Sequence, residues 1–360
     1  MKIGILTYHR SHNYGALLQS VATRVVLEQL GHEAYYVDYW PGYHRRAYAF
    51  IDEKILFSLH MRRALGYIKN KVILVWRCKK LRRKNMNNFI KKYINPYCRS
   101  VSEHYDIILY GSDQIWRKQR EKVGYNPIYF GQNKFKRNKD IAYAASMGIL
   151  PNTLEDIQKL RGLLSHFDRI SVREENLKDF LFNIGFKDIH VCIDPTLLLS
   201  QKKWDEILNI EERNKEKYVL FYDLLPDSFN IQELSNFATE RQYKLKILHS
   251  KPMSKETPDN ICTTSPKGFI NLVRNAEFVF TSSFHGLVFA IIYHKPFLAS
   301  FSRNAGRAES ILQQLGLSFC LIPPMVKIPH KIKSIDFCSV EKKLNTIKEQ
   351  SVQYLLDSLS

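Results

Sequence analysis

The stretch KIGILTY, residues 2–8, is a short apolar run that predicts a β-strand at the start of the chain. A polar loop, residues 9–13, follows it, and the apolar residues then recur at helical spacing over Gly15–Leu30. Gly31 is a typical helix stop, and Ala34–Tyr39 is predicted to be the next strand. A strand, a helix and a second strand in this order indicate a parallel sheet covered by helices on both faces.

The same alternation continues along the chain in two series. The further strands expected are Ile107–Tyr110, Ile141–Ala145, Arg169–Arg173, His190–Ile193, Tyr218–Leu224, Leu245–His249, Phe278–Thr281 and Pro296–Phe301. The further helices expected are Leu154–Phe167, Glu174–Ile184, Ser228–Arg241, Lys267–Asn275, Gly286–Tyr293 and Val340–Leu359. We therefore predict an α/β protein with two doubly wound, Rossmann-like domains and a cleft between them. The expected division is residues 1–205, residues 206–335, and a C-terminal helix at 336–360 that packs back on the first domain.

Composition narrows the class of protein. The chain has 360 residues, of which 45% are hydrophobic and 25% charged, as in a soluble globular protein. No apolar run approaches the roughly 20 residues that cross a bilayer, and the first residues do not resemble a signal peptide. The six cysteines are scattered and form no C-x-x-C pair, so we expect reduced thiols, no zinc site and a cytoplasmic location.

The net charge of +19 is concentrated in one segment. Arg45–Arg99 contains 16 Lys and Arg against two acidic residues, Asp52 and Glu53. Within it, Arg83–Ile94 has the apolar spacing of an amphipathic helix. Such a basic helical insertion suits an anionic membrane surface, an anionic substrate or nucleic acid, and it is also compatible with a simple solvated face.

Four polar loops follow predicted strands, where ligands bind in sheets of this kind. They contain His9–Ala16, Gly111–Trp116, Ser171–Glu174 and Thr281–Gly286. In the first two loops, the candidates for the cleft are Asn13, Tyr14, Gly15, Asp113, Gln114 and Trp116. Asn13 is also a typical helix N-cap. Asp113 has the chemistry to accept protons or bind sugar hydroxyls, or else to cap a tight turn, and Trp116 to stack on a sugar ring.

The other two loops carry the candidates for anion binding and proton transfer. Arg173 offers a bidentate fork for carboxylate or phosphate, or a structural ion pair with Glu174 or Asp194. His285 is predicted at a helix start, where free amides bind anions and an imidazole near neutrality moves protons. Ser282, Ser283, Phe284 and Gly286 complete this turn, and Gly286 would let a ligand approach the backbone closely.

Taken together, these pieces resemble the polysaccharide pyruvyl transferase family. The matching segments, in the order of the family, are Asn13–Ala16 with Leu18-Gln19, Gly111–Gln114 with Trp116, Tyr143–Gly148, Ser171–Glu174, Asp194–Leu198 and Thr281–Gly286 with Lys295–Phe297. They cover about residues 3–300. Two positions depart from the pattern: Met147 stands where Phe is expected, and Ser283 stands where one branch has an arginine two residues before the site histidine.

The resemblance implies a two-domain fold like that of the GT-B glycosyltransferases. It also implies transfer of the enolpyruvyl group of phosphoenolpyruvate to a sugar or lipid-linked glycan precursor, with formation of a pyruvyl ketal and release of phosphate. Under this hypothesis His285 is the general acid and base, and Arg173 with the turn Ser282–Gly286 holds the donor. No metal or further cofactor is expected, and residues 45–99 would bind an anionic membrane surface at the inner face of the cytoplasmic membrane.

Two alternatives stay open at this point. A GT-B glycosyltransferase that uses a nucleotide sugar would have the same sheets and a similar histidine loop. A basic protein that binds nucleic acid or membrane without catalysis would explain the charge. No helix-turn-helix, RRM, KH or zinc pattern is present in the sequence, so we do not expect nucleic acid as the partner.

Overall fold

The computed structural model describes residues 1–49, 66, 73–119, 124–210 and 216–360. Most of the basic segment's middle, including Asp52 and Glu53, lies outside these residues, as does most of the predicted surface turn near 211–217. None of the described helices is both long and apolar enough to cross a membrane.

The first unit is built on a seven-stranded parallel sheet with the strand order β3-β2-β1-β4-β5-β6-β7. Its strands are β1 (Lys2–Leu6), β2 (Glu33–Val37), β3 (Cys98–Arg99), β4 (His104–Tyr110), β5 (Lys136–Ala145), β6 (Arg169–Val172) and β7 (Ile189–Val191). Its helices are α1 (Tyr14–Gln29), α2 (Gly42–Ala47), α5 (Trp76–Tyr93), α6 (Leu154–Leu164), α7 (Glu175–Asn183), α8 (Pro195–Leu198) and α9 (Gln201–Leu208). Each predicted strand of this unit is present.

The second unit has a five-stranded parallel sheet in the order β10-β9-β8-β11-β12. Its strands are β8 (Tyr218–Asp223), β9 (Lys244–His249), β10 (Asn260–Ile261), β11 (Phe278–Thr281) and β12 (Phe297–Ala299). Its helices are α10 (Ile231–Glu240), α11 (Pro266–Asn275), α12 (Phe284–Ile292) and α13 (Gly306–Leu315). Short 3₁₀ turns lie at Asn95–Tyr97, Pro127–Phe130 and Ser318–Cys320. The predicted fold class, two doubly wound α/β units, is confirmed.

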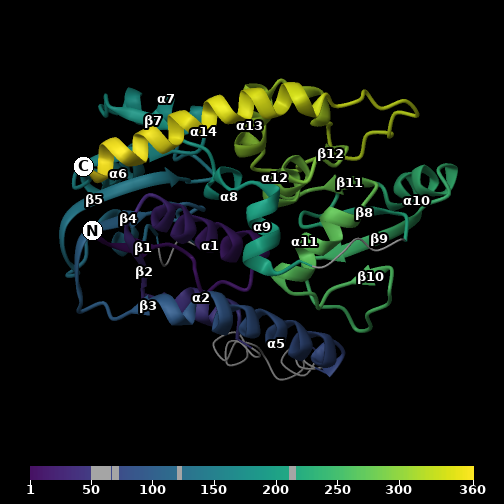
Figure 1. The fold of residues 1–360 in the computed structure, drawn as a ribbon, viewed down its shortest axis with the longest axis horizontal. Helices are drawn as coiled ribbons and strands as arrows, with labels where there is room; N and C mark the ends of the chain where they lie inside the picture. The colour runs from purple at the N-terminus through teal and green to yellow at the C-terminus, as the bar shows by residue number, and fades with distance from the viewer. Residues whose placement is uncertain (50–65, 67–72, 120–123, 211–215) are drawn as a thin grey trace.

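A final helix, α14 (Phe337–Leu359), runs from the second unit back along the first, as Figure 1 shows in yellow. Two of its side chains form hydrogen bonds with the first unit. The Tyr354 hydroxyl donates to the Ala142 carbonyl at 2.9 Å, and the Ser351 hydroxyl accepts from the Ile193 amide at 3.1 Å. The C-terminal half of this helix therefore packs on the first unit, while its start contacts α13 of the second.

The largest apolar cluster is shared by both units. It joins residues of β1 and α1, such as Ile3 and Leu17, with residues of β8 and α12, such as Leu220 and Phe289. Two smaller clusters cover the opposite faces of the two sheets. Because helix α1 is buried along Tyr14–Leu27 and packs against both α8 and α11, it lies at the junction of the units (Figure 1).

Candidate active site

The turn between β11 and α12 is fixed by its own hydroxyl groups. The Ser282 hydroxyl accepts from the amides of Leu224 and Leu225, both at 2.9 Å, and so ties this turn to the end of β8. Ser283 is the N-cap of α12 and accepts from the Gly286 amide at 3.4 Å. The helix begins at Phe284, earlier than predicted, so that His285 lies in its first turn.

His285 lies between the two units and is only 7% exposed. Its Nε2 is 3.5 Å from Oδ2 of Asp194, at the start of α8. On the other side the ring packs against Gly15 of α1, where an added Cβ would lie 2.0 Å from Nδ1. The imidazole is therefore held by one carboxylate of the first unit and by a glycine of the same unit.

Asp194 is the centre of a buried polar cluster. Its Oδ1 accepts from the amide and the hydroxyl of Thr196, at 3.0 and 2.6 Å, and its Oδ2 pairs with Arg173. The Ser112 hydroxyl donates to the same Oδ2 at 3.3 Å. Burial alone would raise the pKa of Asp194, but the neighbouring His285 and Arg173 outweigh it and hold the pKa well below its usual range. Asp194 is therefore an anion that orients the imidazole.

A cavity of about 300 Å³ opens beside His285, between the strand ends of the two units. It is lined by Asn13, Asp113, Gln114, Arg117, Leu224, Leu225, Ser282, Ser283, Phe284, His285, Phe301, Arg303, Asn304 and Arg307. Three of these side chains are arginines and one is an acid, so the lining is positively charged. A cavity of this size and charge fits a small anion with more than one acidic group.

The Phe284 ring lies between two guanidinium groups, with Cζ of Arg173 at 4.8 Å and Cζ of Arg307 at 5.1 Å from its centroid. Burial lowers the pKa of Arg307 to about 10, and the nearby Arg173 acts in the same direction. Nε of Arg307 is 4.0 Å from Oε1 of Glu174, and it makes no hydrogen bond within the described residues. Burial also raises the pKa of Glu174, against the opposing effect of the two arginines. Arg307 is thus a partly buried cation at the edge of the cavity, and its Nε has no hydrogen-bond partner among the described residues.

Of the residues predicted for the site, the structure brings seven together at this cavity: Asn13, Asp113, Gln114, Ser282, Ser283, Phe284 and His285. Asn13 is also the N-cap of α1, which was its alternative prediction, and its side chain accepts a hydrogen bond from the Ala16 amide at 3.3 Å. Asp113 has a positive φ of 58°, which turns the loop after β4, and it accepts from the Gln114 amide at 2.8 Å.

The other five candidates do not line the cavity. Trp116 is fully buried, stacks on Phe130 and donates to the Tyr129 carbonyl at 3.0 Å, so that its indole is a core residue rather than a sugar platform. Tyr14 stacks on Phe269 of α11 and accepts from Arg82 at 3.0 Å.

Arg173 pairs with Asp194 behind Phe284 and borders only a separate space of about 10 Å³, too small for the predicted donor. At Gly286, the space that was expected to admit a ligand is filled by Oγ1 of Thr281, 2.1 Å from the position of an added Cβ. Gly15 contacts the imidazole rather than the cavity.

The sequence analysis did not identify Arg117, Arg303, Asn304 and Arg307 as lining residues. The last three follow β12, which is one of the strands that were predicted, at its carboxyl end. The rule that pointed to the other four loops therefore applies to this loop as well.

Two groups of side chains among the described residues have the spacing of metal ligands, and neither surrounds His285. In the first, His9, Asp38 and Cys98 lie together, but Arg10 already bonds to Asp38. In the second, Cys78, Glu256 and Cys262 lie together, and the Glu256 carboxylate accepts from the amide of Cys262 at 3.2 Å.

The fold and the cavity define a class: a two-domain α/β protein whose strand ends enclose a basic cavity that contains a histidine. The sequence is more specific, since residues 13–303 match the family described as polysaccharide pyruvyl transferase. The chain belongs to this family, one of transferases that act on polysaccharide, and the resemblance found from its motifs is confirmed.

No curated protein matches the chain in sequence. Among solved structures, similar chains include a putative UDP-N-acetylglucosamine 2-epimerase from Listeria monocytogenes, with 12% identity and a TM-score of 0.46 over 97% of this chain and 88% of that one. The E. coli heptosyltransferase WaaC with ADP has 11% identity and a TM-score of 0.42, over 96% of this chain and 100% of that one. These are distant likenesses of overall shape.

Proposed function

We propose that this protein transfers the enolpyruvyl group of phosphoenolpyruvate to sugar hydroxyls, forming a pyruvyl ketal and releasing phosphate. Family membership supports the reaction class. The observation that supports phosphoenolpyruvate as the donor is the cavity of about 300 Å³, which is lined by three arginines and His285. Phosphoenolpyruvate is a compact molecule with a carboxylate and a phosphate, and it needs this combination of cations and a proton donor.

The donor's two acidic groups have separate partners in this proposal. Arg307 and Arg303 follow β12, and Arg117 follows β4, so that cations approach the cavity from both units. The first-turn amides of α12 add the positive end of a helix. Arg307 takes the part that the sequence analysis gave to Arg173. Arg173 acts through Asp194 and is a positioning residue.

His285 moves the protons. A proton is added to the methylene carbon of phosphoenolpyruvate, a first sugar hydroxyl attacks the neighbouring carbon, and the bond from that carbon to the phosphate oxygen breaks. A second hydroxyl then closes the ketal. Of the two protons that the hydroxyls lose, one replaces the proton given to the methyl group and the other leaves with phosphate. Asp194 lies 3.5 Å from Nε2 and orients the ring for this exchange.

The acceptor side of the cavity carries amide and carboxylate groups. Asn13, Asp113 and Gln114 offer the hydrogen-bond partners that sugar hydroxyls require. The acceptor in this proposal is a sugar of a polysaccharide or of a lipid-linked glycan precursor, made on the cytoplasmic side of the membrane.

The first test is ligand binding. Phosphoenolpyruvate should raise the melting temperature of the protein, whereas nucleotide sugars at the same concentration should leave it unchanged. In deuterated water with an acceptor glycan, the product should carry one deuterium in its ketal methyl group, with one phosphate released per ketal. Stabilisation by a nucleotide sugar, with release of the nucleotide diphosphate, would instead identify a glycosyltransferase.

Variants of the site give the second readout. His285→Gln should lower kcat by about 100-fold or more and leave the stabilisation by phosphoenolpyruvate nearly intact. Arg307→Gln should weaken that stabilisation, whereas the control Arg161→Gln, on the exposed face of α6, should change neither quantity. Near-normal turnover in a folded His285→Gln protein would refute the assignment of the histidine.

A further inference from the structure

Helix α5 presents two opposite faces of different chemistry. One face is buried against the rest of the molecule and consists of Cys78, Arg82, Met86, Phe89 and Ile90. At 3.6 residues per turn, the residues farthest from this face are Arg77, Lys80, Lys84 and Lys91, all exposed. Helix α5 contains no acidic residue, and no ion pair joins these four side chains to a carboxylate among the described residues. Among the described residues, the outward face is therefore a stripe of positive charge with no acidic partner.

Large apolar side chains flank this stripe at the start of the helix. Ile73, Leu74, Trp76 and Leu81 are 65%, 49%, 47% and 43% exposed. The Lys80 ammonium lies 4.7 Å from the centroid of the Trp76 ring, so the basic and apolar groups are in direct contact. An exposed tryptophan and aliphatic residues cost free energy in water, whereas a stripe of lysines alone does not. Such a combination is typical of helices that lie in the interface of an anionic bilayer.

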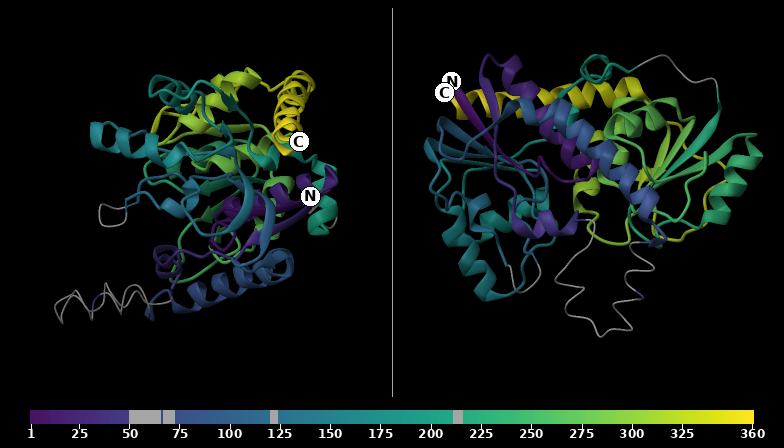
Figure 2. Two further views of the ribbon diagram at one scale, coloured as in Figure 1. Left: turned by 90° about the vertical axis from the view of Figure 1, so that its left-hand side faces the viewer. Right: turned by 90° about the horizontal axis from the view of Figure 1, so that it is seen from below.

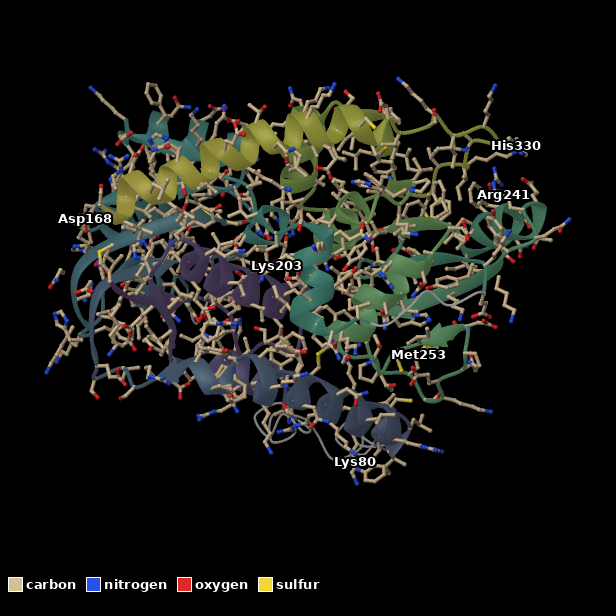
Figure 3. All side chains as sticks on the ribbon, viewed as in Figure 1. Lys80, Asp168, Lys203, Arg241, Met253 and His330 are labelled. Carbon is tan, nitrogen blue, oxygen red and sulfur yellow. The ribbon has the colours of Figure 1, made fainter. Side chains whose placement is uncertain are left out.

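The position of α5 leaves this face accessible. The helix runs along one edge of the molecule beneath both units (Figure 1), and Figure 2 shows the same arrangement from two further sides. In Figure 3, Lys80 projects from this edge away from the body of the protein. Within the described residues, neither sheet lies on the outward side of this helix.

We propose that the outward face of α5, defined by Arg77, Lys80, Lys84 and Lys91 with Ile73, Leu74, Trp76 and Leu81, binds the surface of an anionic lipid bilayer. The lysines and arginine contact lipid phosphates and carboxylates, and the apolar residues enter the headgroup region. A purely electrostatic partner such as nucleic acid would use the charge and leave the aliphatic residues exposed to water.

Vesicle binding tests the charge. The full chain should sediment with phosphatidylcholine vesicles that contain one quarter phosphatidylserine, and not with phosphatidylcholine alone. The triple variant Lys80→Glu, Lys84→Glu, Lys91→Glu should lose on the order of 100-fold in partitioning, from about fivefold for each lysine. The matched control Lys134→Glu, Lys187→Glu, Lys202→Glu makes the same change of net charge at exposed positions outside α5 and should retain binding.

Tryptophan emission tests the insertion. Of the four tryptophans, Trp116 and Trp204 are fully buried, and Trp40 is 36% exposed. Anionic vesicles should shift the emission of the Trp40→Phe variant to shorter wavelength, because Trp76 leaves water, and should not shift that of Trp76→Phe. Three results would overturn the proposal: vesicle binding that ignores lipid charge, equal binding by the α5 triple variant and its control, or tighter binding to a single-stranded oligonucleotide that displaces the protein from vesicles.

Discussion

The contact between Gly15 and His285 shows how a single residue sets the geometry of the site. The two residues are 270 positions apart in the chain, and the imidazole fills the space that a side chain at position 15 would need. The motif Asn13–Ala16 therefore contributes to the site because Gly15 has no side chain and leaves room for the imidazole. From the sequence alone Gly15 was a candidate for the cleft, because nothing in a linear pattern distinguishes room for a ligand from room for a histidine.

Replacing Gly15 with alanine should move the imidazole. The added Cβ would lie 2.0 Å from Nδ1, so the ring must shift. A misplacement of about 1 Å at a reacting group costs on the order of 100-fold in rate, and we expect that loss in kcat. Gly162→Ala on helix α6 is the control, since no atom lies within 4 Å of its added Cβ. Equal turnover in the two variants would mean that His285 does not need its present position.

A second residue, His9, should make the stability of the protein sensitive to acid. Burial lowers the pKa of His9 to about 4, while its Nδ1 lies 3.0 Å from the Thr7 carbonyl. Below pH 6.5 the unfolded chain takes up a proton at this position and the folded chain does not, so stability falls with pH down to about 4. The loss attributable to His9 is roughly 3 kcal/mol. Urea unfolding of His9→Gln should show a shallower decline from pH 6.5 to 4.5 than the wild type, and parallel curves would contradict this origin.

At the scale of elements, helix α5 fastens the two units together through Arg82. Its Nη1 donates to the Tyr14 hydroxyl of the first unit and to the carbonyls of His249 and Cys262 in the second, at 3.0, 3.3 and 2.9 Å. The guanidinium also lies over the Tyr14 ring, with Cζ at 4.9 Å from the centroid. A basic residue in a basic segment thus has a structural role that its exposed neighbours do not share.

Removing this guanidinium should be costly for stability. Arg82→Met leaves a buried hydroxyl and two carbonyls without a donor, and we expect the free energy of unfolding to fall by roughly 3 kcal/mol. Arg83→Met changes the adjacent, exposed arginine and should stay within about 0.5 kcal/mol of the wild type. The comparison is made by urea denaturation at one pH. If both substitutions were equally mild, Arg82 would not join the units.

Elements with a clear repeat of apolar residues were predictable from the sequence, and very short elements were not. The long apolar strands and the amphipathic helices α10 and α11 lie close to their predicted limits. The edge strands β3 and β10 have two residues each, too few to show any alternation. Helix α13 was missed because no element was predicted between Phe301 and Val340, and the sequence analysis also missed Arg307.

At the scale of the whole molecule, two-domain topology was accessible from the sequence because strands and helices alternate in order. The junction was not accessible, because it depends on which faces of α1, α8 and α12 meet. Residues of both units enter one apolar cluster, and the cavity draws its lining from both. Which side chains of a strand-end loop reach that junction is decided by packing across it. For this reason the sequence could not show that Trp116 and Arg173 are buried away from the cavity, whereas Asp113 and His285 line it.

The return of α14 has a consequence for motion. Residues 1 and 360 lie close together on the first unit in all views of Figures 1 and 2, and the Lys139 ammonium donates to the carbonyl of Ser360 at 3.1 Å. The second unit is therefore connected to the first at both of its ends, through the segment after α9 and through α14. Any movement of the second unit relative to the first must therefore bend the chain at both of these connections.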